Sequence, residues 1–136
     1  MHKILRSLAT AAGVAALSAA SCTAGTGSRE TASDTAAARA RLVQLEVEAR
    51  ALARTTGCNT AEQCRTAPLG ARACGGPREY VVYCAATTDS AALYRKLDEL
   101  KAAETKFNQD LGLASTCEFR TPPVTSVQGG SCRTGP

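Results

Sequence analysis

Apolar residues recur at helical spacing in two segments of the chain. The first segment begins near Ser33 or Asp34, either of which can cap a helix, and ends at Thr55 or Thr56, just before Gly57. Its apolar stripe consists of Ala38, Leu42, Leu45, Ala49 and Leu52. Because this stripe is narrow and rich in alanine, we expect a helix that a single partner can cover.

The second segment has the more regular helical pattern. Thr88 or Asp89 caps it, and Gly112 provides the residue that ends it. Its apolar positions are Leu93, Leu97, Leu100, Phe107 and Leu111. Glu104 stands at the one gap in this repeat. The pattern predicts a long amphipathic helix.

One segment has the composition of a β-strand. Residues 79–85 are aromatic and β-branched and are apolar on both faces, so we expect a central strand that is covered on each side. Residues 58–77, which precede it, contain three Gly and two Pro and are expected to form a loop. After the second helix, residues 124–127 have the pattern of a short strand, and Gly129 and Gly130 mark a turn.

These elements together predict an α+β fold. We expect two long amphipathic helices packed on a small two- to three-stranded sheet, in a loop-rich domain that disulfides stabilise. Residues 35–136 are long enough for one such small domain. The segment before it, residues 22–34, is rich in Gly, Ser, Thr and Ala and is expected to be a flexible tether.

The start of the chain has the pattern of an export signal. Residues 1–21 combine a basic beginning with an uncharged stretch over residues 8–20. As a helix, that stretch spans roughly 20 Å, which is shorter than the roughly 30 Å hydrocarbon core of a bilayer. Residues 1–21 are therefore interpreted as a cleaved signal peptide.

Cys22 directly follows the small residues Ala19, Ala20 and Ser21. This order resembles a bacterial lipobox, in which the cysteine receives a diacylglycerol and becomes the first residue of the mature chain, although Leu is usual where Ala19 stands. We expect a lipid-anchored protein of the bacterial cell envelope, at the outer membrane if Thr23 acts as a sorting signal. Ordinary cleavage after Ala20, which gives a periplasmic or secreted protein, and an uncleaved anchoring signal are the alternatives.

The remaining cysteines are predicted to form disulfides. They are Cys58, Cys64, Cys74, Cys84, Cys117 and Cys132. The segment 35–136 has about twenty large apolar side chains and no Trp, so disulfides at about 2–4 kcal/mol each would stabilise it substantially. Six cysteines allow fifteen pairings, and the sequence leaves the choice among them open.

The predicted mature sequence lacks the residues that most catalytic mechanisms require. The one histidine, His2, lies in the signal segment, and no C-x-x-C pair is present, so we expect no metal, no other cofactor and no enzyme. The carboxylate pairs 46/48 and 98/99 are expected to be solvated helix positions. The net charge of +4 falls to +2 without Lys3 and Arg6, and the remaining cations form no run that would bind nucleic acid.

Two functions follow as hypotheses, beside a third, a small hydrolase, which would need carboxylates clustered in a cleft. The first is a non-catalytic binding or structural module, held at the membrane by its lipid, with a protein partner in the envelope. The second is an inhibitor of an extracytoplasmic protease or other hydrolase, acting through a loop braced by a Cys64–Cys74 disulfide. The residues of that candidate binding loop are Pro68, Leu69, Gly70 and Arg72.

A block of residues in the second half of the chain carries a family resemblance. It contains Pro68-Leu69-Gly70, Cys74-Gly75-Gly76-Pro77, Tyr80 and Tyr83, followed by the amphipathic helix and Cys117, Pro122-Pro123 and Cys132. Over residues 58–132 the chain resembles short cysteine-rich bacterial lipoproteins of uncharacterised function. The resemblance implies an envelope location and a shared fold, and it implies no activity.

Overall fold

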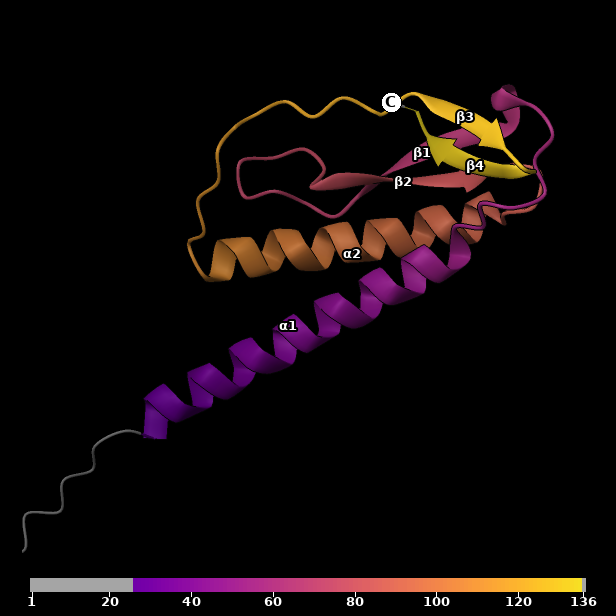
Figure 1. The fold of residues 1–136 in the computed structure, drawn as a ribbon. Helices are drawn as coiled ribbons and strands as arrows, with labels where there is room; N and C mark the ends of the chain where they lie inside the picture. Colours follow the sequence, from indigo (N-terminus) through magenta and orange to yellow (C-terminus); the bar gives the residue numbers. More distant parts are fainter. Residues whose placement is uncertain (1–25, 136) are drawn as a thin grey trace, which may run out of the picture.

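The two helices lie on one side of a β-hairpin, and a second, shorter hairpin lies on its other side (Figure 1). This computed structural model describes residues 26–135, so the predicted signal peptide 1–21 and Cys22 lie outside the described residues. The elements are α1 (Thr26–Leu52), the 3-10 turn η1 (Ala61–Gln63), β1 (Cys64–Leu69), β2 (Glu79–Cys84), α2 (Ser90–Asp110), β3 (Thr125–Gln128) and β4 (Ser131–Thr134). The α+β fold class is confirmed, as two antiparallel two-stranded sheets.

The β1–β2 hairpin separates two apolar clusters because side chains alternate between its faces. The residues that face the helices are Ala67, Leu69, Val81 and Tyr83. Cys64 and Cys84 point to the opposite face, against which β3 and β4 pack. The strand predicted over residues 79–85 is therefore present and covered on each side. Its central position was wrong, because β1 is its one neighbour in the sheet.

β1 lies within the segment 58–77, so the prediction of a loop there was wrong for six residues. Pro68 belongs to this strand and stands opposite Tyr80. A proline is compatible with β1 because the strand is paired on one edge alone, and its other edge needs no backbone donor. Burial of Ala67 and Leu69, neither of which is exposed, stabilises this short strand.

The first helix is longer at its N-terminus than the sequence predicts. α1 begins at Thr26, so the expectation of a flexible tether over 22–34 was wrong from that residue onward. No Gly or Pro interrupts the chain between Ser28 and the end of the helix, and its many alanines have the highest helix propensity. The first helix therefore starts before the predicted domain boundary at residue 35.

α1 ends at Leu52, within one turn of its predicted end. Beyond it the backbone bonds to the strands instead of continuing the helix. The amide of Cys84 donates to the carbonyl of Arg54 at 2.6 Å, and the amide of Cys132 donates to the carbonyl of Thr55 at 2.7 Å. Tertiary hydrogen bonds thus replace the last helical turn.

The two helices are antiparallel and pack through the apolar stripes that the sequence predicts. Their buried residues in the main core are Leu45, Ala49, Leu93, Leu97 and Leu100. Ala38 and Leu111 are exposed, because the helices diverge toward the N-terminus of α1 (Figure 1). Asp89 caps α2 as predicted, and its carboxylate accepts the Ala92 amide at 2.9 Å. Neither α1 nor α2 combines the length and the hydrophobicity that a bilayer crossing requires.

The last hairpin follows the predicted order of a short strand and a turn. β3 occupies Thr125–Gln128, one residue later than predicted, and β4 pairs with it. Gly129 and Gly130 join them with φ angles of +55° and +73°, which is the left-handed conformation of a tight hairpin turn. Thr56 extends the pairing by an isolated bridge to Ser131, which connects the end of α1 to this hairpin.

Glu104, the gap in the apolar stripe of α2, anchors the loop that joins β1 to β2. Its side chain is 10% exposed, and one carboxylate oxygen lies 3.0 Å from the guanidinium of Arg78. The other oxygen accepts the backbone N–H of Ala71. Arg78 also pairs with Glu46 of α1 at 2.6 Å. A buried carboxylate needs such partners, so this position links both helices to the loop.

Gly70→Ala is expected to be poorly tolerated. The residue has a φ of +70°, and a Cβ built there would overlap the carboxylate of Glu104. We expect the free energy of unfolding to fall by about 2 kcal/mol, because backbone strain adds to displacement of a buried charge. Gly76 has a similar φ of +74° with no atom within 4 Å of an added Cβ, so Gly76→Ala is the matched control. Urea denaturation measures both variants, and equal losses would contradict the role of Glu104.

Candidate functional site

Two disulfides form the apolar cluster between the hairpins. They join Cys58 to Cys84 and Cys64 to Cys132, with Cα–Cα distances of 5.7 and 5.5 Å. All four residues are at most 5% exposed, and the sulfur atoms of Cys58, Cys84 and Cys132 lie within 4.8 Å of one another. Since each is bonded to sulfur, none is the thiolate that binds a metal. The prediction of disulfides is confirmed for these four cysteines.

Cys64 and Cys84 face each other across the β1–β2 hairpin but bond to other segments. They are register partners, so both side chains project from the same face. Cys84 reaches back to Cys58 after α1, and Cys64 reaches Cys132 on β4, with sequence separations of 26 and 68 residues. Each disulfide therefore fastens the hairpin to a different part of the fold.

The Cys64–Cys74 brace of the inhibitor hypothesis was wrong. Cys64 begins β1, and Cys74 lies in the loop beyond the far end of that strand. An extended strand of six residues spans roughly 20 Å, far beyond the reach of a disulfide. Cys132 occupies the position that Cys74 was expected to take.

The candidate binding loop is partly strand and partly buried, and among its four residues Pro68 alone is exposed. Its expected residues were Pro68, Leu69, Gly70 and Arg72. Leu69 is fully buried in β1, and Gly70 is buried against Glu104. The guanidinium of Arg72 donates to the backbone carbonyls of Thr116 and Glu118. With Leu69 buried and Arg72 bonded to the backbone of residues 116–118, these residues do not form the disulfide-braced loop that was expected.

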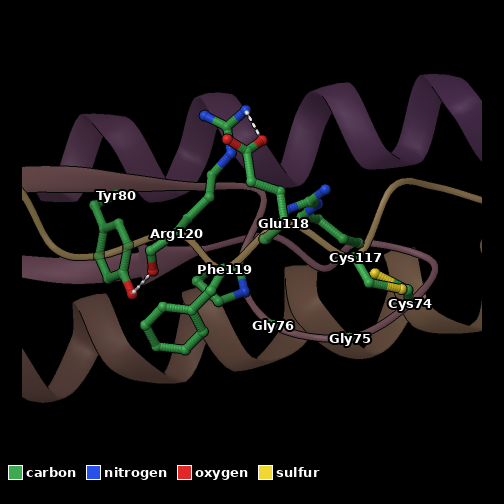
Figure 2. Close-up of a pocket in the computed structure, with 10 residues that line it drawn as sticks. Cys74, Gly75, Gly76, Tyr80, Cys117, Glu118, Phe119 and Arg120 are labelled. Carbon is green, nitrogen blue, oxygen red and sulfur yellow. Dashed lines mark hydrogen bonds and ion pairs between the residues drawn. The ribbon is translucent and has the colours of Figure 1, made fainter.

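The other two cysteines of the described residues meet at the surface. Cys74 lies in the loop between β1 and β2, and Cys117 lies in the segment between α2 and β3; both are exposed and neither is in a disulfide. Figure 2 shows their sulfur atoms pointing toward one another. The Cys74 amide donates to the Ser115 hydroxyl at 3.2 Å, and its thiol donates to the Thr116 carbonyl at 3.4 Å. These bonds hold the two segments side by side.

The environment distinguishes the two thiols. The pKa of Cys74 lies below its ordinary value, first because Cys117 donates a hydrogen bond to its sulfur, and then because Ser115 and the positive charge of Arg72 also stabilise the thiolate. The same hydrogen bond, together with partial desolvation, raises the pKa of Cys117. Cys74 is therefore the thiol that ionises first and the better nucleophile at neutral pH.

A hollow of about 330 Å³ adjoins the two thiols (Figure 2). The glycine loop at residues 75–76 and the chain at residues 117–120 form its sides. The Tyr80 hydroxyl donates to the backbone carbonyl of Arg120 at 3.2 Å, which fixes one end of the hollow. Phe119 is 87% exposed, so most of its side chain contacts solvent. The hollow is therefore flanked by an exposed aromatic ring.

The residues that line the hollow include two thiols, one carboxylate and no histidine. Glu118, its one carboxylate, lies 4.0 Å from Arg120. The single histidine of the chain, His2, lies outside the described residues. Nucleophilic hydrolysis by a cysteine requires a base that activates the thiol and a donor set for the oxyanion. The arrangement instead suits reactions in which a thiolate attacks sulfur, because these need no such base.

The carboxylate pairs 46/48 and 98/99, which the sequence analysis considered, form ion pairs or are exposed. Glu48 pairs with Lys96 at 2.8 Å, and Glu99 pairs with the same ammonium group at 2.7 Å. Glu46 contacts Arg50 at 2.8 Å. Asp98 is exposed. They are distributed over helix surfaces and do not line the hollow beside the thiols.

Sequence reasoning did not find the Cys74–Cys117 pair or Phe119. The cysteines are 43 residues apart (117 − 74), and the chain between them includes β2 and the whole of α2. The Gly75-Gly76 pair was the one local signal, because it marks a sharp turn beside Cys74. Comparisons of the chain with models of protein families, with curated proteins and with solved structures found no match.

Proposed function

We propose that the protein is a lipid-anchored binding module of the bacterial cell envelope, with no catalytic role of its own. The observation that carries this proposal is the pair of buried disulfides between the hairpins. Disulfides form and persist in oxidising compartments, of which the bacterial periplasm is one. This chemistry agrees with an export signal over residues 1–21, and the lipid on Cys22 is proposed from the order Ala19-Ala20-Ser21-Cys22 in the sequence.

The surface around the hollow supports a binding role. Phe119 and Tyr80 contribute aromatic surface, and hydrogen bonds from Arg72 and Tyr80 hold the segment that carries Phe119 in place. A preorganised aromatic contact lowers the entropy cost of association. The partner that fits this surface is a protein segment with an apolar side chain, which would pack against the ring of Phe119.

Production of the full chain in a bacterium with a labelled fatty acid tests the anchor. We expect the label on the wild-type protein in the membrane fraction and none on Cys22→Ser, which should keep both buried disulfides. Both described disulfides join other cysteines, so we expect this substitution to leave them in place.

Two other outcomes would count against parts of the proposal. An unlabelled protein that is released from the cell with both disulfides formed would contradict the lipid anchor and would still agree with export. A protein found in the cytoplasm with Cys58 and Cys84 reduced would contradict the envelope location as a whole.

A further inference from the structure

We propose that Cys74 and Cys117 form a thiol–disulfide exchange site, which reacts with an external disulfide and closes into a third, surface disulfide. The inference goes beyond the binding role and does not depend on whether Cys22 is lipidated. It rests on the facing sulfur atoms, on their exposure and on the hydrogen bonds that hold the two segments together (Figure 2).

The surroundings position both sulfur atoms before any bond forms. Arg72 donates to the carbonyl of Thr116, the residue before Cys117, and to the carbonyl of Glu118, the residue after it. The Cys74 amide donates to Ser115 at 3.2 Å. Because the backbones on both sides are already joined, closing the disulfide requires side-chain rotation and little movement of the chain.

The reaction is a two-step exchange. The Cys74 thiolate attacks one sulfur of an external disulfide R–S–S–R, which breaks that bond, releases one RS⁻ group and leaves a Cys74–S–S–R mixed disulfide. The Cys117 thiol then loses its proton and attacks the Cys74 sulfur, which expels the second RS⁻. The protein dithiol loses two electrons, the external disulfide gains them, and the two RS⁻ groups take up the two thiol protons.

Exposure separates this pair from the other disulfides. Cys58, Cys64, Cys84 and Cys132 are at most 5% exposed, whereas Cys74 and Cys117 are both exposed. An external thiol or disulfide can therefore reach the surface pair while the native fold excludes it from the buried sulfurs. Closure of the pair would also covalently fix the segment that carries Phe119 to the β1–β2 loop.

Peptide mapping of the intact protein tests the proposal directly. The folded chain is treated briefly with a mild reductant, equilibrated with oxidised glutathione, alkylated at low pH and digested with trypsin. The cleavage sites place Cys74 in peptide 73–78 and Cys117 in peptide 107–120, while the four buried cysteines fall in peptides 55–65, 79–95 and 121–133. We expect 73–78 linked to 107–120, and the other three peptides linked among themselves.

Single substitutions separate the two steps. In Cys117→Ser the resolving thiol is missing, so a glutathione adduct should accumulate on Cys74. In Cys74→Ser the adduct on Cys117 should form more slowly at pH 7, because Ser115 assists the thiolate of Cys74 and not that of Cys117. In both variants the linked peptides 55–65, 79–95 and 121–133 report that the fold is intact.

Two results would overturn the proposal. The first is the recovery of alkylated thiols in both peptide 73–78 and peptide 107–120 after equilibration with oxidised glutathione. The second is either peptide linked to one of the three that hold the buried cysteines. Equal adduct rates in the two single variants would overturn the assignment of Cys74 as the attacking sulfur.

Discussion

Replacement of Cys64 and Cys132 together by alanine is expected to lower the free energy of unfolding by about 4 kcal/mol. This disulfide closes a loop of 68 residues, the longer of the two buried bridges, and so removes the most conformational entropy from the unfolded chain. It also joins β1 to β4, and its loss would leave the small second hairpin packed mainly through the Cys58–Cys84 bridge and Val127. A small domain has little stability in reserve, so part of the population should be unfolded at 37 °C.

Urea denaturation of the double alanine variant and of the wild type, each with and without reductant, measures this effect. Reductant should lower the midpoint of the wild type strongly. The control is Thr134→Ala, an exposed residue on the same strand as Cys132, which should change stability by no more than about 0.5 kcal/mol. A double variant as stable as the oxidised wild type would show that the Cys64–Cys132 disulfide does not stabilise the fold.

The second large effect is expected for Glu104→Ala, at about 3 kcal/mol. The substitution leaves the N–H of Ala71 without its acceptor, removes the ion pair with Arg78 and opens a cavity beside α2. Burial lowers the pKa of Arg78, but hydrogen bonds to Glu104 and Glu46 outweigh it and raise the value overall. The side chain of Arg78 is 39% exposed, so water replaces part of its lost interaction, and the amide of Ala71 accounts for more of the cost.

Glu99→Ala is the matched control for Glu104→Ala. It removes a carboxylate from the same helix, but one whose side chain is 41% exposed and pairs with Lys96 at the surface. We expect a loss within about 0.5 kcal/mol there. A double-mutant cycle of Glu104→Ala with Arg78→Ala should give a coupling of about 1 kcal/mol, and additive effects would contradict a direct ion pair.

The sequence predicts the helices well because their burial is periodic and local. Leu93, Leu97 and Leu100 are all buried where the stripe places them, and Asp89 caps the helix as expected. The gap at Glu104 was visible in the pattern. Its reason was not, because Arg78 and the amide of Ala71 belong to a loop whose position depends on the tertiary fold.

The sequence did not predict the strand β1, for a related reason. Its sequence, Cys-Arg-Thr-Ala-Pro-Leu, has a proline and little β-branched character, so local propensity favours a loop. Pairing with β2 and burial of Ala67 and Leu69 override that preference. The start of α1 shows the opposite error, since a composition rich in Ser and Thr is typical of a tether, while an uninterrupted chain after Ser28 allowed the helix to continue.

The candidate site was the least predictable part of the molecule. Sequence alone gives the number of cysteines, and the fold decides which of the fifteen pairings occurs. Cys64 and Cys84 lie opposite each other on neighbouring strands, yet each bonds to a third segment that packs on their common face. Cys74 and Cys117 meet because the segment after α2 runs back along the β1–β2 loop (Figure 1).

The pairing of the four buried cysteines decides whether this account is correct, and one digest distinguishes this pairing from the alternatives. Digestion of the unreduced protein with trypsin and a glutamate-specific protease cuts after Glu62 and Glu79, which separates Cys58 from Cys64. The account predicts peptide 55–62 bonded to peptide 80–95, and peptide 63–65 bonded to peptide 121–133. Peptide 55–62 bonded to peptide 121–133, or free thiols in all four peptides, would contradict it.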